Sequence, residues 1–188
     1  MAVSDEELMR QVQAGRHAAF ETLVARYRPV LVRVAVSKLG DRALGEDAAQ
    51  ETLLAVFAAR HTFNPRYSFR TWLWTILLHL CAQQWKRQQS SDRCGGVIDP
   101  QVADATANNA ETALDALLRT ERSDLLQRAL LELPEPQADA LRLRFFAGLT
   151  FDEVAAAMSS SVSGAKQRVK HGLERLAHRL RTLQGVEP

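Results

Sequence analysis

The 188-residue sequence lacks most of the features that mark disulfide-stabilised, metal-binding or membrane-spanning proteins. It has only two cysteines, Cys81 and Cys94, and no Cys-x-x-Cys pair, which excludes a disulfide framework and the common zinc sites. No apolar run approaches the roughly 20 residues of a membrane span. The N-terminus MAVSDEELMR is acidic, whereas a signal peptide starts with basic and then apolar residues. We therefore expect a cytoplasmic protein with no metal ion and no cofactor.

Catalytic signatures are missing as well. The sequence contains no glycine-rich phosphate loop, no His-Glu metal motif and no serine or cysteine nucleophile motif. Cys81 lies in an apolar helical segment and is expected to be a small packing residue. The composition, 46% hydrophobic and 24% charged, is typical of a globular protein with one or two small domains. The sequence thus predicts a binding protein and not an enzyme.

Strand patterns are almost absent from the first half of the chain, where apolar residues recur at helical spacing. The pattern predicts helices over residues 5–14 and 18–39, with breaks near Gly15 and at Gly40. Pro29 predicts a kink, or a restart between two helices. The fold class that follows is all-α.

The charge changes sign along the chain. Residues 1–88 carry 12 basic and 8 acidic side chains, residues 89–120 carry 2 and 5, and residues 121–188 carry 10 and 9. The acidic middle is rich in Gly, Ser, Asp and Asn and shows no sustained period, which predicts a flexible linker. The sequence therefore predicts two small helical domains, 1–88 and 121–188, joined by the linker 89–120. About 22 extended residues reach on the order of 70 Å, so the two domains can bind sites far apart.

A helix-turn-helix pattern begins after Gly148, which is placed to end a helix. Thr150 and Glu153 form a capping-box pattern for a short apolar helix. Ser161 is a suitable N-cap for the long basic helix that follows a serine-rich turn. A short capped helix, a polar turn and a basic amphipathic helix in this order predict a DNA-binding helix-turn-helix.

The two faces of the last helix differ in composition. One face is an apolar stripe that we expect to pack inward: Val162, Ala165, Val169, Leu173, Leu176, Leu180 and Leu183, with Gly172 at its edge. Gln167 and His171 lie opposite this stripe. Basic side chains flank them on both sides: Lys166 and Lys170 on one, Arg168 and Arg175 on the other. Groups that can hydrogen-bond to base edges thus lie between groups that can bind phosphates, which favours DNA binding over a merely solvated helix face.

Aromatic and basic residues alternate between residues 60 and 88. Single-stranded nucleic acid requires this combination, because bases stack on rings while cations hold phosphates. Part of the set must be core, and we expect Trp72 to pack inward on one helical stripe with Ile76 and Leu80, to which Leu73 and Leu77 can be added. The better nucleic-acid candidates are the loop 62–69 and four later helix positions: His79, Gln83, Lys86 and Arg87.

The segment GEDAAQETLLAVF predicts a helix with an exposed polar patch. Its apolar positions form one stripe, which leaves Glu46, Asp47, Gln50 and Glu51 on the outside. Taken alone, this patch is typical of an ordinary solvated helix face.

Three segments follow one another along the chain: GEDAAQETLLAVF, FRTWLWTILLHL and LPEPQADALRLRFFAGLTFDEVAAAM. In this order and spacing they resemble the successive motifs of bacterial RNA polymerase sigma factors of the extracytoplasmic-function (ECF) type, and the resemblance covers nearly the whole chain. It implies a sigma factor that binds core RNA polymerase, directs promoter recognition and helps to melt the DNA in transcription initiation. It also implies an anti-sigma factor as an inhibitory partner.

The resemblance assigns roles to residues in each domain. Asp47, Gln50 and Glu51 match the positions that dock on core polymerase. The loop 62–69 matches the family's specificity loop, which captures a flipped non-template base of the minus-ten element. We therefore expect minus-ten contacts from Phe63, Asn64, Arg66, Tyr67, Phe69, His79, Gln83, Lys86 and Arg87. The positions that contact the minus-thirty-five element are matched by Lys166, Gln167, Lys170 and His171, to which the helical arrangement adds Arg168 and Arg175.

Four positions depart from the family pattern. The family commonly has Asn at the position of His79 and Arg at that of Thr75, so we expect an unusual minus-ten preference. Arg is also frequent where this chain has Ala138 and Leu173, so both positions lack a cation of the usual set.

Two other functions fit part of the sequence. A free-standing helix-turn-helix regulator uses the same C-terminal fold, but it normally dimerises to read two half-sites, and no dimerisation heptad is present. A helical adaptor without a nucleic-acid role leaves the basic face of the last helix without a function. Tight binding of a specific DNA sequence by the isolated chain, without polymerase, distinguishes the regulator from a sigma factor.

Overall fold

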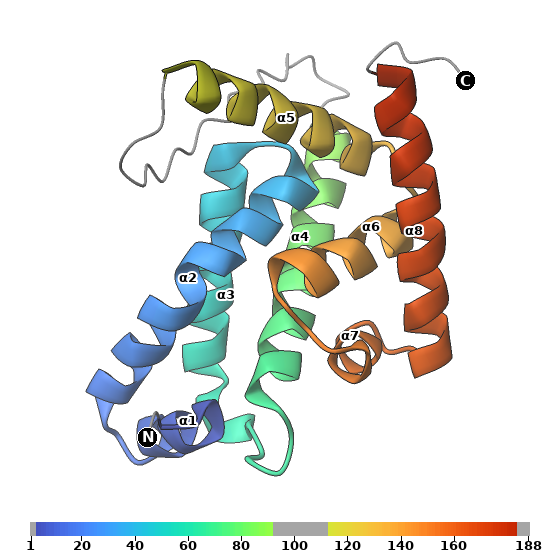
Figure 1. Ribbon diagram of the computed structural model, residues 1–188. Coiled ribbons are helices and arrows are strands. Elements are labelled where there is room, and N and C mark those ends of the chain that lie inside the picture. Colours follow the sequence, from blue (N-terminus) through green and yellow to red (C-terminus); the bar gives the residue numbers. More distant parts are fainter. Residues whose placement is uncertain (1–2, 92–112, 184–188) are drawn as a thin grey trace.

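The computed structural model describes residues 3–91 and 113–183, and every regular element in these two ranges is helical (Figure 1). The first range contains α1 (Asp5–Gln13), α2 (His17–Leu39), α3 (Arg42–Ala58), the 3-10 turn η1 (Arg60–Thr62) and α4 (Phe69–Ser91). The second contains α5 (Ala113–Leu131), α6 (Glu135–Leu141), the π-helical turn η3 (Arg142–Phe146), α7 (Phe151–Ala157) and α8 (Val162–Leu183). The all-α prediction is confirmed. None of the helices just named has both the length and the apolar content of a membrane span.

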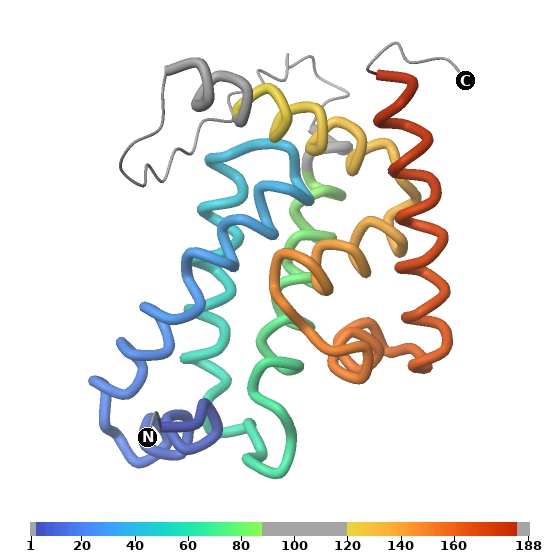
Figure 2. The backbone as a smooth tube through the Cα atoms, in the orientation of Figure 1, coloured from blue at the N-terminus to red at the C-terminus, as the bar shows by residue number. Residues whose placement is uncertain are grey.

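The first four helices pack into a bundle in which α2 and α4 both contact α3 (Figure 2). The predicted break at Gly40 is present, and its φ of 76° ends α2 in the left-handed region that glycine favours. Asp41 then caps α3, since its side chain accepts a hydrogen bond from Leu44 N at 2.8 Å. Helix α2 runs through Pro29 without a restart. The helix tolerates this proline because Ala25, whose carbonyl loses its partner, is exposed.

All members of the predicted stripe of α4 are at least half-buried. Leu73 and Leu77 are fully buried, whereas Trp72, Ile76 and Leu80 are only half-buried. The reason is that α4 contacts α1, α2 and α3 of its own domain as well as α7 of the second. The spacing of apolar residues along the sequence does not predict so many neighbouring helices.

The second domain contains the predicted helix-turn-helix in α7 and α8. Thr150 and Glu153 form the capping box that starts α7. At the start of α8, Ser161 Oγ accepts a hydrogen bond from Gly164 N at 3.0 Å. Gly148, with a φ of 65°, ends the preceding turn as expected. The local signals for this motif are therefore all confirmed.

Most of the predicted apolar stripe of α8 packs inward: Ala165 and Val169 are buried, and Val162, Leu176 and Leu180 are half-buried. Gly172 lies within the contact with α6 and not at its edge, because a Cβ there would be 3.0 Å from Leu141 Cδ1. Leu173 and Leu183, which were expected to pack inward, are each 43% exposed. The absence of a Cβ at Gly172 lets α6 approach α8 closely.

The two domains contact each other directly. Helix α2 contacts α5 and η3, and α4 contacts α7. Helix α4 extends to Ser91 and α5 begins at Ala113, so both ends of the segment predicted as a linker, 89–120, are helical. The rest of that segment, with Cys94, lies outside the described residues.

Candidate polymerase and nucleic-acid interfaces

The acidic and amide patch lies on the exposed face of α3. Asp47, Gln50 and Glu51 are all exposed, and Glu51 accepts a hydrogen bond from Gln84 Nε2 of α4 at 3.3 Å. Leu54 extends the patch and is 61% exposed. The polar pattern of the segment did not indicate this leucine, although Leu54 follows Gln50 by four positions and so shares its helix face. An apolar side chain surrounded by polar ones is typical of a protein interface.

Helix α1 fixes the loop between η1 and α4. Gln13 Nε2 donates hydrogen bonds to the carbonyls of Arg60 and Phe63, both at 2.8 Å. Glu6 Oε1 accepts a hydrogen bond from Phe69 N at 3.0 Å, at the start of α4. These partners are 47 to 63 residues apart in the sequence, so no local pattern could have revealed them.

Phe63 and Phe69, two of the expected minus-ten residues, have buried rings. They are 5% and 1% exposed, and their ring centroids lie 5.8 Å apart in an edge-to-face arrangement. Trp72 joins them, with its ring centroid 5.1 Å from that of Phe63. Large apolar rings gain free energy from burial. The two phenylalanines therefore pack in the core below the loop and stabilise its conformation.

Asn64, Arg66 and Tyr67 are candidate minus-ten residues that the loop exposes. Asn64 Oδ1 accepts a hydrogen bond from Arg66 N at 3.0 Å, which forms an Asx turn. Tyr67 is 71% exposed. An exposed ring beside a cation can stack on an unpaired base while the cation contacts a phosphate. We call these three residues the loop tip.

Four exposed residues of α4 form a polar ridge: His79, Gln83, Lys86 and Arg87. Gln83 Nε2 lies 2.7 Å from His79 Nε2, so these two side chains are within hydrogen-bonding distance of each other. At 1.5 Å per residue, the ridge lies roughly 15 to 27 Å along the helix from Phe69. The loop tip and the ridge are thus two separate candidate surfaces within residues 62–87, and the structure does not bring them together.

The predicted DNA-reading face of α8 is open to solvent. Its exposed members are Lys166, Gln167, Lys170, His171 and Arg175, and Arg168 is half-buried. Lys166 Nζ lies 5.8 Å from the ring centroid of Phe151, and Lys170 Nζ lies 4.0 Å from Glu174 Oε1. Exposed contacts of this kind contribute little free energy. Both ammonium groups can therefore exchange them for phosphates.

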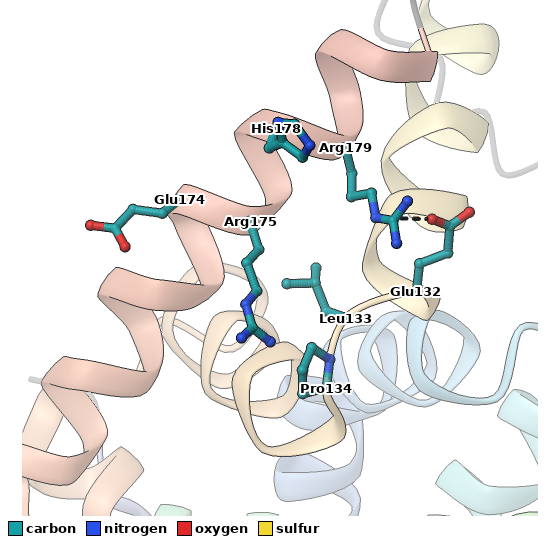
Figure 3. A pocket seen from close by; sticks show the side chains of 7 residues that line it. All are labelled: Glu132, Leu133, Pro134, Glu174, Arg175, His178 and Arg179. Atoms are coloured by element: carbon teal, nitrogen blue, oxygen red, sulfur yellow. Dashed lines mark ion pairs between the residues drawn. The ribbon is translucent and has the colours of Figure 1, made fainter.

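A cavity of about 600 Å³ lies beside the second half of α8 (Figure 3). It is lined by Glu132, Leu133, Pro134, Glu174, Arg175, His178 and Arg179. Figure 3 shows the Arg175 side chain pointing towards Pro134, and Arg179 Nε lies 3.3 Å from Glu132 Oε2. Arg175 therefore lies at the border between the DNA-reading face and this cavity, unlike Gln167.

Cys81 is fully buried, as predicted for a packing residue. Burial raises the pKa of its thiol to about 12, so the thiol stays neutral at physiological pH. Within residues 3–91 and 113–183, no group of three or more His, Cys, Asp or Glu side chains is arranged to hold a metal ion.

Comparisons with known proteins bear on both domains. The family model of Sigma-70 region 2 matches residues 23–91, and that of Sigma-70 region 4 matches residues 123–176. The RNA polymerase sigma-H factor of Pseudomonas aeruginosa is 28% identical over 184 residues, 95% of each chain. The ECF RNA polymerase sigma factor SigW of Bacillus subtilis is 24% identical, over 97% of this chain and 100% of its own. The chain belongs to the ECF sigma factors. Its function is to direct RNA polymerase in transcription initiation.

The fold of this sigma factor matches solved structures over most of its length. CnrH in complex with the cytosolic domain of CnrY has a TM-score of 0.74 at 22% identity, covering 96% of this chain and 99% of the other. The sigma factor RpoE of Bartonella quintana, in complex with the anti-sigma factor NepR, has a TM-score of 0.67 at 25% identity, covering 86% and 96%.

Each candidate surface lies within one of the two matched regions. Region 2 contains the α3 patch, the loop tip and the polar ridge, and region 4 contains α7 and the DNA-reading face of α8. Helix α1, whose Glu6 and Gln13 fix the loop, precedes the matched range.

Proposed function

We propose that this sigma factor uses three surfaces, one for each of its contacts in initiation. The α3 patch, with Leu54, docks on core polymerase. The loop tip and the polar ridge hold the melted minus-ten element, and the α8 face reads the minus-thirty-five element. The observation that carries the proposal is that all three surfaces are exposed at once, on separate elements of one chain. The chain supplies binding, the chemistry of RNA synthesis belongs to the polymerase, and both act in the cytoplasm.

Docking on polymerase is supported by the composition of the α3 patch. Two carboxylates and an amide surround an exposed leucine on one helix face. In protein interfaces, a few residues carry most of the binding free energy, at 2 kcal/mol or more each for a typical hot spot, which is roughly a 30-fold loss of affinity on truncation.

Equilibrium binding of the full chain to core polymerase tests the docking surface. We expect Asp47→Ala and Leu54→Ala each to weaken binding by about 10-fold or more. Glu21→Ala is the matched control, because Glu21 is an exposed carboxylate of the same domain on α2. Equal affinities for all three variants would remove α3 from the interface.

Capture of a minus-ten base is supported by the free-energy balance at the loop tip. Flipping a base out of the duplex costs a few kcal/mol. Stacking on an aromatic ring returns about 1 to 3 kcal/mol per base, and Tyr67 is the exposed ring of the loop. Tyr67→Ala should reduce promoter opening about 10-fold, measured by the reactivity of unpaired thymines, whereas Tyr67→Phe keeps the ring and should retain opening. Full opening with Tyr67→Ala would contradict this role.

We also infer that an anti-sigma factor inhibits this chain. The support is the similarity to the Bartonella quintana sigma factor solved in complex with an anti-sigma factor. Isolation of the chain from cells in which its promoters are silent should yield a complex with a second polypeptide. Free, fully active chain in those cells would contradict the inference.

A further inference from the structure

The short helix α1 lies at the end of the first domain where the loop between η1 and α4 turns (Figure 1). A helix of nine residues is marginally stable by itself in water. The side chains of Leu8, Met9 and Val12 are buried in the core, between 0% and 5% exposed. Packing against α2 and α4 therefore keeps α1 helical and fixes its position.

A polar contact also attaches the start of α1 to α2. The Asp5 carboxylate accepts hydrogen bonds from the Arg26 guanidinium and the Tyr27 hydroxyl. Burial and the hydrogen bond to Asp5 raise the pKa of Tyr27, so the phenol keeps the proton that it donates. The Tyr27 ring also meets the Phe69 ring edge to face, with the centroids 5.6 Å apart. Helix α1 is thus attached to a residue that itself packs against the first residue of α4.

From this fixed position α1 holds both ends of the loop. Gln13 is the last residue of α1, and its amide group donates to the carbonyls of Arg60 and Phe63, before the loop tip. Glu6, in the first turn, accepts a hydrogen bond from the backbone N–H of Phe69, after the loop tip. At 1.5 Å per residue, these two side chains start roughly 10 Å apart along the helix. They fix the two points of the backbone between which the loop tip lies.

The hydrogen bonds within the loop tip fix its shape but not its position. Asn64 Oδ1 accepts from Arg66 N, and the Asn64 carbonyl accepts from Tyr67 N, both at 3.0 Å. Both bonds join residues of the tip itself, so they move with it as a unit. The position of the tip relative to α4 depends on the bonds at its ends and on the buried rings of Phe63 and Phe69.

Capture of a flipped base benefits if this position is set before the DNA arrives. Fixing the backbone of one residue costs about as much free energy as stacking one base on a ring returns. If the loop tip became ordered only on binding, this cost would cancel much of the gain from Tyr67. A preformed loop avoids the cost.

We propose that Glu6 and Gln13 are positioning residues for the capture of the minus-ten base, which hold the loop tip in its binding conformation from α1 without contacting DNA. The proposal rests on the role of the loop tip proposed above. Helix α1 precedes the residues that match region 2, so this contribution comes from outside the matched segment. Promoter opening should depend on these two side chains, whereas binding to the minus-thirty-five element and to core polymerase should not.

Promoter opening by the reconstituted holoenzyme tests Gln13. Gln13→Ala removes both hydrogen bonds to the loop and keeps a good helix former in α1. We expect opening to fall about 10-fold, measured by the reactivity of unpaired thymines, with unchanged affinity for core polymerase. Gln11→Ala is the matched control, because the hydrogen bond of Gln11 to Glu7, at 3.4 Å, stays within α1. This control should open the promoter as well as the unaltered chain, and circular dichroism shows whether each variant is folded.

Glu6 allows a test with a conservative variant. Glu6→Ala removes the acceptor for the Phe69 N–H, whereas Glu6→Gln keeps an oxygen that can accept it. We expect opening to fall about 5-fold for Glu6→Ala and to be retained for Glu6→Gln. In the free chain, the Phe69 amide proton should exchange with solvent about 5-fold faster in Glu6→Ala, measured by nuclear magnetic resonance.

A double variant shows whether Gln13 acts through the loop tip. If it does, Gln13→Ala combined with Tyr67→Ala should open the promoter about as poorly as Tyr67→Ala alone, because the position of a missing ring no longer matters. Additive losses would mean that Gln13 only stabilises the domain, and would overturn the proposal.

Two further results would overturn the positioning role. One is normal opening by Gln13→Ala and Glu6→Ala while Tyr67→Ala is defective, and the other is unchanged exchange of the Phe69 amide in Glu6→Ala. The proposed function fails in a different way, if the unaltered chain opens no promoter or if Tyr67→Ala opens it fully. The exchange measurement needs no promoter, so it tests the attachment of the loop to α1 separately from the proposed function.

Discussion

Replacing Gly45 by alanine should destabilise the first domain by bringing α2 and α3 into collision. A Cβ at this position would lie 2.4 Å from Val36 Cγ2, 2.6 Å from Val36 N and 2.8 Å from Val36 Cα. Favourable contacts between carbon atoms need about 3.5 to 4.0 Å. Two of the three atoms belong to the backbone and cannot rotate away, so α3 has to move from α2.

The size of the effect follows from two opposing terms. Overpacking costs about 1 to 3 kcal/mol, and a collision with backbone places Gly45→Ala at the upper end. The better helix propensity of alanine returns up to about 1 kcal/mol. The net loss in the free energy of unfolding is about 2 kcal/mol, which lowers the Tm of a domain of this size by about 8 to 16 °C.

Thermal unfolding of the full chain, followed by circular dichroism, measures this loss. Gly164→Ala in α8 is the control, because the atoms nearest its added Cβ are side-chain ends: Ser161 Oγ at 3.2 Å and Arg168 Nη1 at 3.8 Å. Combining Gly45→Ala with Val36→Ala removes only the Cγ2 contact. The Tm of this double variant should therefore stay close to the Tm of Gly45→Ala alone. An unchanged Tm for Gly45→Ala would refute the close approach of α2 and α3, and full recovery in the double variant would refute the backbone collision.

Three further predictions concern the helix-turn-helix and the contact between the domains. Gln167→Ala or His171→Ala should change the preferred minus-thirty-five sequence by about 1 to 3 kcal/mol per lost base contact, whereas Lys170→Ala should weaken binding to every sequence and lower its salt dependence. Holoenzyme binding to a promoter library separates these effects, and equal losses at all sequences would contradict the assigned face. Thr150→Ala should lower the stability of the second domain by about 1 kcal/mol in a urea melt, and unchanged stability would mean that the capping box contributes nothing. Hydrogen bonding and charge from Lys38 hold the pKa of Glu135 below its usual range. Its contribution to the domain contact is therefore present at neutral pH and lost as the pH falls through the lowered value. The change in the inter-domain distance between pH 7 and roughly pH 3 should be smaller for Glu135→Gln than for the unaltered chain. Equal changes would exclude a contribution of this carboxyl to the domain contact.

Local signals in the sequence were sufficient for the helix-turn-helix. Thr150 and Glu153 are three residues apart, and Ser161 caps a helix that begins at the next residue. The exposed side of α8 follows from helical periodicity, so the sequence predicted Gln167 and His171 as exposed residues. Each of these features depends on neighbours within about one helical turn.

Features that depend on distant partners could not be predicted. Phe63 and Phe69 lie in a segment whose aromatic and basic residues are typical of a nucleic-acid-binding loop. Their burial becomes visible only from their packing with Trp72. Lys38 in the last turn of α2 is typical of a solvated cation at a helix C-terminus. Its partner Asp139 lies 101 residues further along the chain, and Asp139 carries no local signal of burial.

Run-off transcription with sigma-free core polymerase tests the central claim most directly. With genomic promoter fragments as templates, we expect transcripts of defined length when the chain is added. We expect none without the chain, and strongly reduced amounts with Asp47→Ala and Leu54→Ala combined. The account is contradicted if the folded chain, free of any inhibitor, yields no transcript from any genomic promoter while it binds a specific duplex tightly on its own.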